Sequence, residues 1–381
     1  MTASRRDFCA MLAGASILVP AIDVHAKDKR SLKALAADKG ILFGSAVGAG
    51  AAGSLTGSFS DPDYLKILQR ECAVIVPENE LKSYVISPSR EKFDLEPADR
   101  IAAFVRDNGM KLRGHTLLWN HPDYMPKWLA ELDSATAARE YLVPYIQRVC
   151  AHYGDRIYSW DVVNESIDPK SGELRDTSFT RLLGFDALRI CYETAREKLP
   201  RVQLVYNDYM SWDAGHEKHR AGVLRLLEQF RSKQVPVDAL GIQSHIGNGS
   251  MDEGQRKEWK AFLDAVVAMD YRLLITEFDV SDKDLPTDFA TRDARVAAAG
   301  KDYLDFMLSY RELDQVLCWG MADKYSWLQG FKPRDDGTAK RTTPYDDAYK
   351  AKPLRDAIAS AFQAAPKRSG VAASSRRALL R

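Results

Sequence analysis

Two apolar runs that each end in a glutamate carry the residues best suited to chemistry. Residues 160–165 read WDVVNE and residues 273–279 read LLITEFD, so Glu165 and Glu277 each close a run typical of a buried strand. A single glutamate at a strand end is more often solvated or ion-paired than catalytic. Two that face each other can hydrolyse a glycosidic bond, because one acid protonates the leaving oxygen while the other carboxylate attacks the sugar or activates water.

The elements that would position this pair follow a repeating pattern. Short apolar runs alternate with longer amphipathic segments, at a spacing of roughly 30 to 45 residues. The runs begin near Ile41, Ala73, Leu112, Tyr158, Gln203, Ala239, Leu273 and Val316. Eight strands alternating with helices predict an α/β fold, a single-domain (β/α)8 TIM barrel, whose active site forms at the carboxyl ends of the strands. An open doubly wound sheet is the alternative, but no G-x-G-x-x-G follows a strand, so a dinucleotide site has no support.

Composition excludes several classes of protein. The chain has 381 residues, with 54 Lys+Arg against 53 Asp+Glu, a net charge of +1. A nucleic-acid binder or a polybasic membrane-surface protein would need a basic excess. The apolar share of 45% and the charged share of 28% are ordinary for a globular protein. One predicted helix, over residues 137–153, contains Pro144, which should kink or interrupt it.

The two ends of the chain differ from the rest. Arg5 and Arg6 precede an uncharged stretch, residues 8–22, and Ala26 offers a cleavage site. This pattern predicts a twin-arginine signal peptide over residues 1–26 and a periplasmic or secreted protein, with a cytosolic helix as the alternative. We assign residues 27–365 to the catalytic domain and residues 366–381, which are basic and lack an apolar period, to a flexible tail. Four cysteines match no metal or redox spacing and are predicted to be buried free thiols: Cys72, Cys150, Cys191 and Cys318.

Taken in order, several motifs resemble those of glycoside hydrolase family 10, the endo-1,4-β-xylanases. Besides the two glutamate runs they are PENELK at 77–82, GHTLLW at 114–119, YNDY at 206–209, QSH at 243–245 and WGMAD at 319–323. The resemblance extends from about Leu32 to Phe362. It implies hydrolysis of internal β-1,4 bonds of xylan with retention of configuration by double displacement. In that mechanism Glu165 is the acid/base, Glu277 is the nucleophile, and no cofactor or metal takes part.

The resemblance also implies a set of sugar contacts. Glu78, Asn79 and Lys82 match polar contacts on the glycone side, and Asn164 would bond the sugar 2-hydroxyl. The remaining substrate-binding candidates are His115, Trp119, Tyr209, Gln243, His245, Trp319 and Trp327. Read alone, a tryptophan of this set is equally well explained by core packing, whereas His245 is better explained as a satisfied core histidine and Lys82 as a surface charge.

Support for the nucleophile is assigned to His245 and Asp279. His245 would bond Glu277, and a charged or donating imidazole would keep that carboxylate ionised. Glu277 and Asp279 are two residues apart, so on a continuing strand they share a face and Asp279 would orient His245.

One motif departs from the family. The family commonly has Trp-His-x-Gln where this chain reads Trp119-Asn120-His121-Pro122, so a glycone-side hydrogen bond is expected to be lost with the amide. The rival functions are a related retaining hydrolase for another β-linked glycan or for short xylo-oligosaccharides, and a non-catalytic sugar-binding barrel. The expected partners are xylan or xylo-oligosaccharides, with no nucleic acid and no membrane after leader removal, and the protein is expected to be a monomer.

Overall fold

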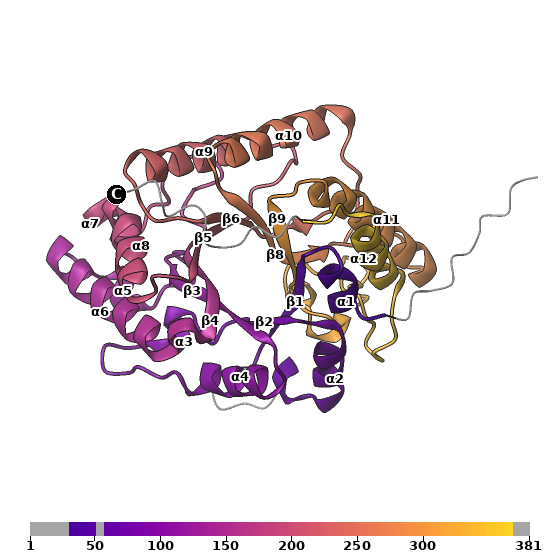
Figure 1. Ribbon diagram of the computed structural model, residues 1–381, viewed down its shortest axis with the longest axis horizontal. Helices are drawn as coiled ribbons and strands as arrows, with labels where there is room; N and C mark the ends of the chain where they lie inside the picture. The colour runs from indigo at the N-terminus through magenta and orange to yellow at the C-terminus, as the bar shows by residue number, and fades with distance from the viewer. Residues whose placement is uncertain (1–29, 51–56, 369–381) are drawn as a thin grey trace, which may run out of the picture.

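The computed structural model describes residues 30–50 and 57–368, and eight parallel strands close into a barrel within them. The strand order is β6-β5-β4-β3-β2-β1-β9-β8, and pairing of β6 with β8 closes the ring that Figure 1 shows from one end. The strands are β1 (Leu42–Val47), β2 (Val74–Pro77), β3 (Lys111–Trp119), β4 (Ile157–Asn164), β5 (Gln203–Asp208), β6 (Ala239–Ile242), β8 (Arg272–Val280) and β9 (Leu313–Cys318). A two-residue strand, β7 (His245–Ile246), pairs with the end of β8. The predicted (β/α)8 barrel is confirmed.

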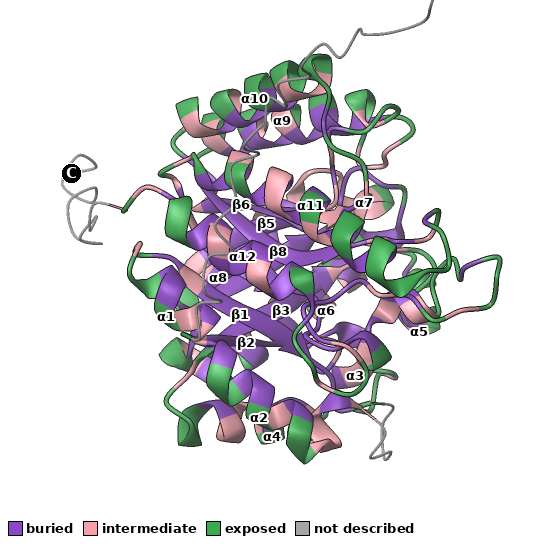
Figure 2. Cartoon of the chain, turned by 90° about the vertical axis from the view of Figure 1, so that its right-hand side faces the viewer, coloured by how far each residue is buried: buried purple, intermediate pink, exposed green. Residues whose placement is uncertain are grey.

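Helices surround the barrel and turn apolar faces towards it. They are α1 (Leu32–Ala37), α2 (Pro62–Glu71), α3 (Ser83–Ile86), α4 (Glu96–Asp107), α5 (Lys127–Ala130), α6 (Ala135–Tyr153), α7 (Ser178–Leu183), α8 (Asp186–Lys198), α9 (Glu217–Ser232), α10 (Glu253–Ala268), α11 (Phe289–Leu308) and α12 (Pro353–Ala364). Figure 2 shows buried strands inside and exposed residues on the outer faces of the helices. This two-layer burial is why the strands read as near-continuous apolar runs in the sequence.

Close packing inside the barrel requires a glycine at position 114. The indole of Trp160 is fully buried and lies over Gly114 on the neighbouring strand. A Cβ built on Gly114 would lie 2.2 Å from that ring, so no other residue fits there without displacing the strand. The contact fixes the spacing of β3 and β4, the two strands that carry Trp119 and Glu165 to the rim.

Several expectations about single elements can now be compared with the structure. Helix α6 runs without a break through Pro144, so the predicted interruption does not occur. The four cysteines named above are free and buried, as predicted. Within the described ranges, no helix combines the length and apolar character that crossing a membrane requires.

The predicted tail begins with residues that contact the barrel. The Arg368 guanidinium donates to the carbonyl oxygens of Leu313 at 2.8 Å, Tyr310 at 3.0 Å and Leu308 at 3.1 Å. Its backbone N–H donates to Lys39. Contacts of the domain therefore continue to Arg368, three residues past the predicted boundary. The rest of the tail, like the predicted leader at residues 1–26, lies outside the described residues.

Candidate active site

A cavity of about 590 Å³ opens at the carboxyl ends of the barrel strands, where the fold predicts an active site. It brings together thirteen of the fourteen residues expected from the sequence: Glu78, Asn79, Lys82, His115, Trp119, Asn164, Glu165, Tyr209, Gln243, His245, Glu277, Trp319 and Trp327. Asp279 is the exception, because it lies behind His245 and is buried. Both glutamates therefore face one cavity, while the part each plays in binding or catalysis stays a prediction.

Glu165 sits just past β4 in a left-handed backbone conformation, with φ of 55°. Its backbone is fixed on both sides, because its N–H donates to the Asn207 carbonyl and its own carbonyl accepts from Arg175 Nε, each at 2.9 Å. Its carboxylate accepts from Trp119 Nε1 at 2.9 Å and from Gln243 Nε2 at 2.7 Å. Strand-end geometry and neutral donors thus hold the carboxyl group in the cavity.

Glu277, on β8, is surrounded by positive charge and donors. Asn207 Nδ2 donates to its Oε1 at 2.7 Å, and His245 Nε2 lies 3.4 Å from its Oε2. Burial raises the pKa of Glu277, but the bond from His245 and the charges of His115, His245 and Lys82 outweigh burial, so the pKa lies below its usual value. Glu277 is therefore ionised at neutral pH, as a nucleophile must be.

His245 is held by the short strand that the sequence pattern did not predict. Pairing of β7 with β8 places His245 opposite Asp279, whose Oδ2 lies 3.0 Å from His245 Nδ1. Burial lowers the pKa of His245, but the carboxylates of Asp279 and Glu277 raise it to about 10. Trp327 Nε1 donates to the same Asp279 oxygen at 2.8 Å. The imidazolium between two carboxylates matches the arrangement expected from the sequence.

Asn207 connects the two glutamates. Its Nδ2 donates to Glu277 and also to Asn164 Oδ1 at 2.8 Å, while Asn164 Nδ2 lies 3.2 Å from Glu165 Oε1. Thr276 Oγ1 donates to Asn207 Oδ1 at 2.7 Å and fixes the orientation of the amide. No role was predicted for Asn207, although it belongs to the motif at 206–209. Its place at the end of β5, between the two glutamate strands, is the signal that could have identified it.

His115 is positioned by an ion pair inside the barrel. The register of β3 and β4 sets His115 opposite Asp161, and His115 Nδ1 lies 2.9 Å from Asp161 Oδ2. Arg113 forms a buried ion pair with the same aspartate at 2.5 Å. Burial raises the pKa of Asp161, but Arg113 and His115 outweigh burial and lower it. This aspartate thus holds the His115 ring at Nδ1, and the ring lines the cavity.

Lys82 is a buried part of the cavity rather than a surface charge. Its exposed fraction is 8%, its Nζ donates to Asn79 Oδ1 at 3.2 Å, and it lies 4.5 Å from the centre of the Trp119 ring. Burial lowers the pKa of Lys82, opposed by the charges of Glu277 and Glu78. Burial also raises the pKa of Glu78 to about 7, with Glu80 and Glu277 acting in the same direction.

Eight further residues line the cavity and were not expected from the sequence: Tyr84, His121, Tyr124, Ser211, Asp213, His216, Phe331 and Lys332. Most lie on loops after β3, β5 and β9, where no apolar period reports their orientation. Two of them stack on tryptophans that were predicted to bind substrate. The Tyr124 ring stacks on Trp119 at 4.7 Å between centroids, and Phe331 stacks on Trp327 at 4.8 Å.

The departure from the family motif has a structural outcome. Asn120 is fully buried, and its Nδ2 donates to Thr177 Oγ1 at 2.9 Å, so it supports the loop instead of facing the cavity. Among the described residues Pro122 does not line the cavity, but its neighbours His121 and Tyr124 do. The lost amide is therefore replaced in this region by an imidazole and a phenol.

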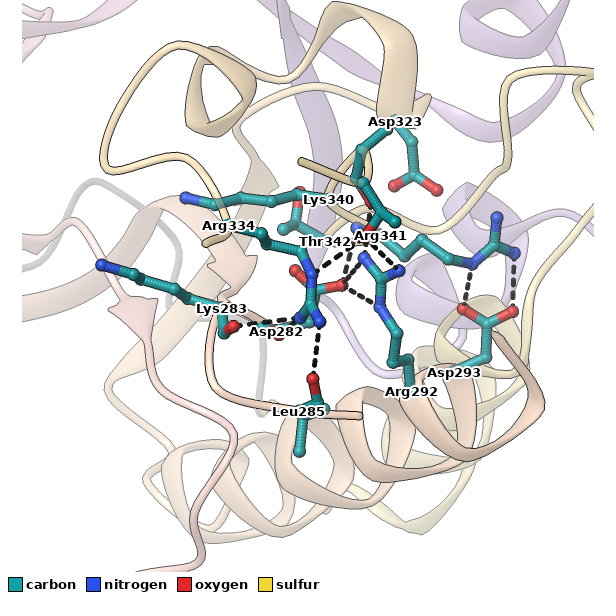
Figure 3. A network of polar contacts seen from close by, with 12 residues as sticks. Asp282, Lys283, Leu285, Arg292, Asp293, Asp323, Arg334, Lys340, Arg341 and Thr342 are labelled. Carbon is teal, nitrogen blue, oxygen red and sulfur yellow. Dashed lines mark hydrogen bonds and ion pairs between the residues drawn. The ribbon is translucent and has the colours of Figure 1, made fainter. Parts of the chain in front are cut away.

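A network of buried charges anchors the loop that carries Trp327 and Phe331 (Figure 3). The Arg334 guanidinium donates to the carbonyl oxygens of Asp282, Lys283 and Leu285, which follow β8. Asp282 also accepts from Arg292 Nε at 2.8 Å. The loop after β9 is thus tied to the loop after β8, the strand that carries Glu277. In the described ranges no group of three or more metal-ligating side chains is placed to hold a metal ion.

Comparisons with known proteins agree with this geometry. The model of glycosyl hydrolase family 10 matches residues 31–361. Endo-1,4-beta-xylanase B of Paenibacillus barcinonensis is 34% identical over 68% of this chain and 80% of its own length. Endo-1,4-beta-xylanase 5 of Pyricularia oryzae is 31% identical over 88% of this chain and 79% of its own. The crystal structure of native xylanase 10B from Thermotoga maritima superimposes with a TM-score of 0.77 at 27% identity, covering 87% of this chain and 98% of that one.

Proposed function

The chain belongs to glycosyl hydrolase family 10, and from this we propose that it is a retaining endo-1,4-β-xylanase acting on internal β-1,4-xylosidic bonds of xylan. The observation that carries the proposal is the pair of glutamates in one cavity, joined through Asn164 and Asn207. A non-catalytic sugar-binding barrel would need the aromatic and amide groups of the cavity but neither glutamate.

The environments of the two glutamates suit different steps. In the first step Glu277 attacks the anomeric carbon while Glu165 gives its proton to the leaving oxygen, which breaks the glycosidic bond and forms a glycosyl-enzyme. In the second step Glu165 takes a proton from water, and that water displaces Glu277 from the same carbon. Two inversions give net retention. His245 keeps Glu277 ionised before the attack, and its charge favours departure of the carboxylate in the second step.

Release of reducing sugar from xylan, cellulose and xylotriose tests the activity and separates the rival glycans. Proton NMR of the first sugar formed from xylan tests the stereochemistry, and initial formation of the α-anomer would contradict retention. Glu165→Ala with added azide should give the β-glycosyl azide, whereas Glu277→Ala should give the α-anomer. A binding protein would release no sugar above background in any of these assays.

Export by the twin-arginine route belongs to the same proposal. It rests on Arg5 and Arg6 and on the short apolar stretch that follows them. Changing both arginines to lysine should leave unprocessed protein in the cytoplasm, and unchanged activity outside the cytoplasm would refute this route.

A truncation after Arg368 should not change the melting temperature, whereas a truncation after Ala365 should lower it, because only the latter removes the Arg368 contacts.

We also propose that the enzyme acts as a monomer. Within the described ranges the exposed large apolar side chains are Tyr124, Phe289 and Phe331, and the first and last of these line the cavity. They do not form the wide apolar surface that a permanent dimer buries. Light scattering on the purified protein tests this, and a mass near twice 42.7 kDa would overturn it.

A further inference from the structure

We propose that Lys283 and Lys332 bind the carboxylate of a uronic acid side group on xylan, so that the enzyme distinguishes acidic xylan from neutral xylan. This inference rests on the proposed xylanase function and adds a substrate class to it, namely xylan whose backbone carries acidic substituents. The sequence resemblance assigned no role to either lysine.

The two lysines lie on neighbouring loops along one flank of the cavity. Lys283 follows β8 and Lys332 follows β9, these two strands pair with each other, and Lys332 lines the cavity. Glu78, which is expected to contact the glycone sugars, follows β2, and β6 lies opposite β2 on the ring. A xylan backbone that crosses the mouth of the barrel from β2 therefore has the loops after β8 and β9 at its side. A substituent on a backbone hydroxyl projects to that side, whereas the backbone itself does not.

The protein does not neutralise either ammonium group with a carboxylate. Lys332 is exposed and Lys283 is half-buried, and among the described residues neither Nζ forms an ion pair. The acidic residues nearest in sequence pair with arginines or with no lysine of this flank: Asp282, Asp284, Asp335 and Asp336. Two ammonium groups without a counter-charge beside a substrate cavity favour a ligand that brings a negative charge of its own.

A third lysine adds to the positive charge between the two loops. Lys340 is buried, and its Nζ donates to the carbonyl oxygen of Phe331 at 2.6 Å. The side chains of Lys340 and Lys283 extend to the same side of the charge network (Figure 3). Burial lowers the pKa of Lys340, and the charges of Lys283 and Lys332 lower it as well, against the charge of Asp282. The three ammonium groups are thus close enough to repel one another, and a bound carboxylate would offset that repulsion.

The backbone that carries the two lysines is fixed, and an aromatic ring lies beside them. Arg334 Nη1 donates to the carbonyl oxygen of Lys283 at 3.0 Å, so the guanidinium that anchors the loop after β9 also holds the residue that bears the other ammonium group. The Phe331 ring stacks on Trp327, is 45% exposed and has its centre 5.2 Å from Lys332 Nζ. An aromatic ring covers the apolar face of a sugar, while the ammonium groups next to it bind the carboxylate.

Two forms of one polymer test the assignment. Carbodiimide activation followed by borohydride reduction converts the uronic acids of glucuronoxylan into neutral hexoses of nearly the same size. The two polymers then differ in charge but hardly in shape. The parent enzyme should have a higher kcat/KM for the native polymer than for the reduced one. Sodium chloride at about 0.5 M should remove most of this preference, because salt screens exposed charges.

Charge variants identify the residues responsible. We expect Lys283→Gln and Lys332→Gln each to lower the ratio of kcat/KM for native polymer to that for reduced polymer about two- to fivefold, as for one exposed ion pair. Lys332→Arg should keep most of the ratio, and Lys332→Glu should lower it further than glutamine does. Lys233→Gln is the matched control, because Lys233 is an exposed lysine outside the cavity whose Nζ lies 5.7 Å from the centre of the Phe185 ring. Its ratio should equal that of the parent.

The failures of the inference and of the proposed function are distinguishable. A parent enzyme that hydrolyses neither polymer overturns the proposed function. A parent that hydrolyses both equally well, or the reduced polymer better, overturns the role of the lysines, as does a ratio that stays unchanged in both glutamine variants. Equal losses on both polymers also overturn it, because they would show that the lysines support the loops instead of binding a carboxylate. Melting curves accompany each variant, and where Lys332→Gln does not fold, the comparison of Lys332→Arg with Lys332→Glu decides.

Discussion

The charge on His245 can be removed while its hydrogen bond to Glu277, the proposed nucleophile, is kept. Burial lowers the pKa of His245, but Asp279 and Glu277 raise it to about 10, so the ring is an imidazolium at neutral pH. His245→Gln retains an amide donor close to the position of Nε2, 3.4 Å from Glu277 Oε2, but it binds no proton. The variant therefore separates the effect of the charge from that of the donor.

The size of the effect follows from the change in pKa on folding. An unfolded histidine has a pKa of about 6.5, and each tenfold change in proton affinity is worth about 1.4 kcal/mol, so the charge stabilises the fold by at most about 5 kcal/mol. Because the folded pKa is the higher one, this stabilisation is complete below pH 6.5 and is lost as pH rises to about 10. Between those limits one proton leaves on unfolding, which gives a slope of about −1.4 kcal/mol per pH unit.

Urea unfolding of the parent and of His245→Gln, followed by tryptophan fluorescence at pH 7, 8 and 9, measures that slope. The difference in free energy of unfolding between the two proteins should shrink by about 3 kcal/mol from pH 7 to pH 9. In kinetics, the acidic limb of kcat/KM should move to higher pH in the variant, since Glu277 loses a neighbouring positive charge. A stability difference that does not change with pH would refute an imidazolium at this position.

Three other side chains give further predictions. Arg175→Ala should lower kcat/KM for xylan about tenfold or more and should also lower the melting temperature, since the carbonyls of Glu165 and Ile167 and the hydroxyl of Tyr209 lose a charged donor. Burial raises the pKa of Glu78 to about 7, so the parent should lose stability as the pH rises from 4.5 to 7. Urea unfolding should show that this loss is smaller by up to about 3 kcal/mol in Glu78→Gln, which cannot ionise. Arg334→Ala should lower the free energy of unfolding by about 3 kcal/mol and raise KM, measured by urea unfolding and xylan kinetics, because three carbonyls lose their donor and the Trp327 loop loosens.

The strands were predictable because burial on both sides leaves a direct trace in the sequence. The predicted strand starts at Ile41 and Leu273 each lie one residue from the observed starts of β1 and β8. Strand β9 begins at Leu313, three residues before the predicted start at Val316. The prediction missed these residues because they include two polar side chains, Asp314 and Gln315, which interrupt the apolar run. Strand β7 has two residues, which is too short for any periodicity to show.

The loop residues were not predictable, because contacts between distant segments place them. His121 faces the cavity and Asn120 is buried because Asn120 bonds Thr177, which lies 57 positions further along the chain. Arg334 reaches carbonyls that are about fifty positions earlier in the sequence. Neither pairing leaves a local pattern. Read position by position, the sequence at 120–122 indicates only a lost amide, whereas in the structure the side chain of His121 lines the cavity in the same region.

The two glutamates show how the fold assigns different chemistry to one residue type. The neighbours of Glu277 on β7, β3 and the loop after β2 bring His245, His115 and Lys82, and these charges keep its pKa low against burial. The carboxylate of Glu165 instead accepts from Trp119 and Gln243, two neutral donors that orient it without adding charge. Glu277, the proposed nucleophile, can therefore remain ionised in the same cavity as Glu165, the proposed acid/base. The difference between the surroundings of the two glutamates originates in the strand order, because β7 pairs with β8 and places His245 opposite Asp279.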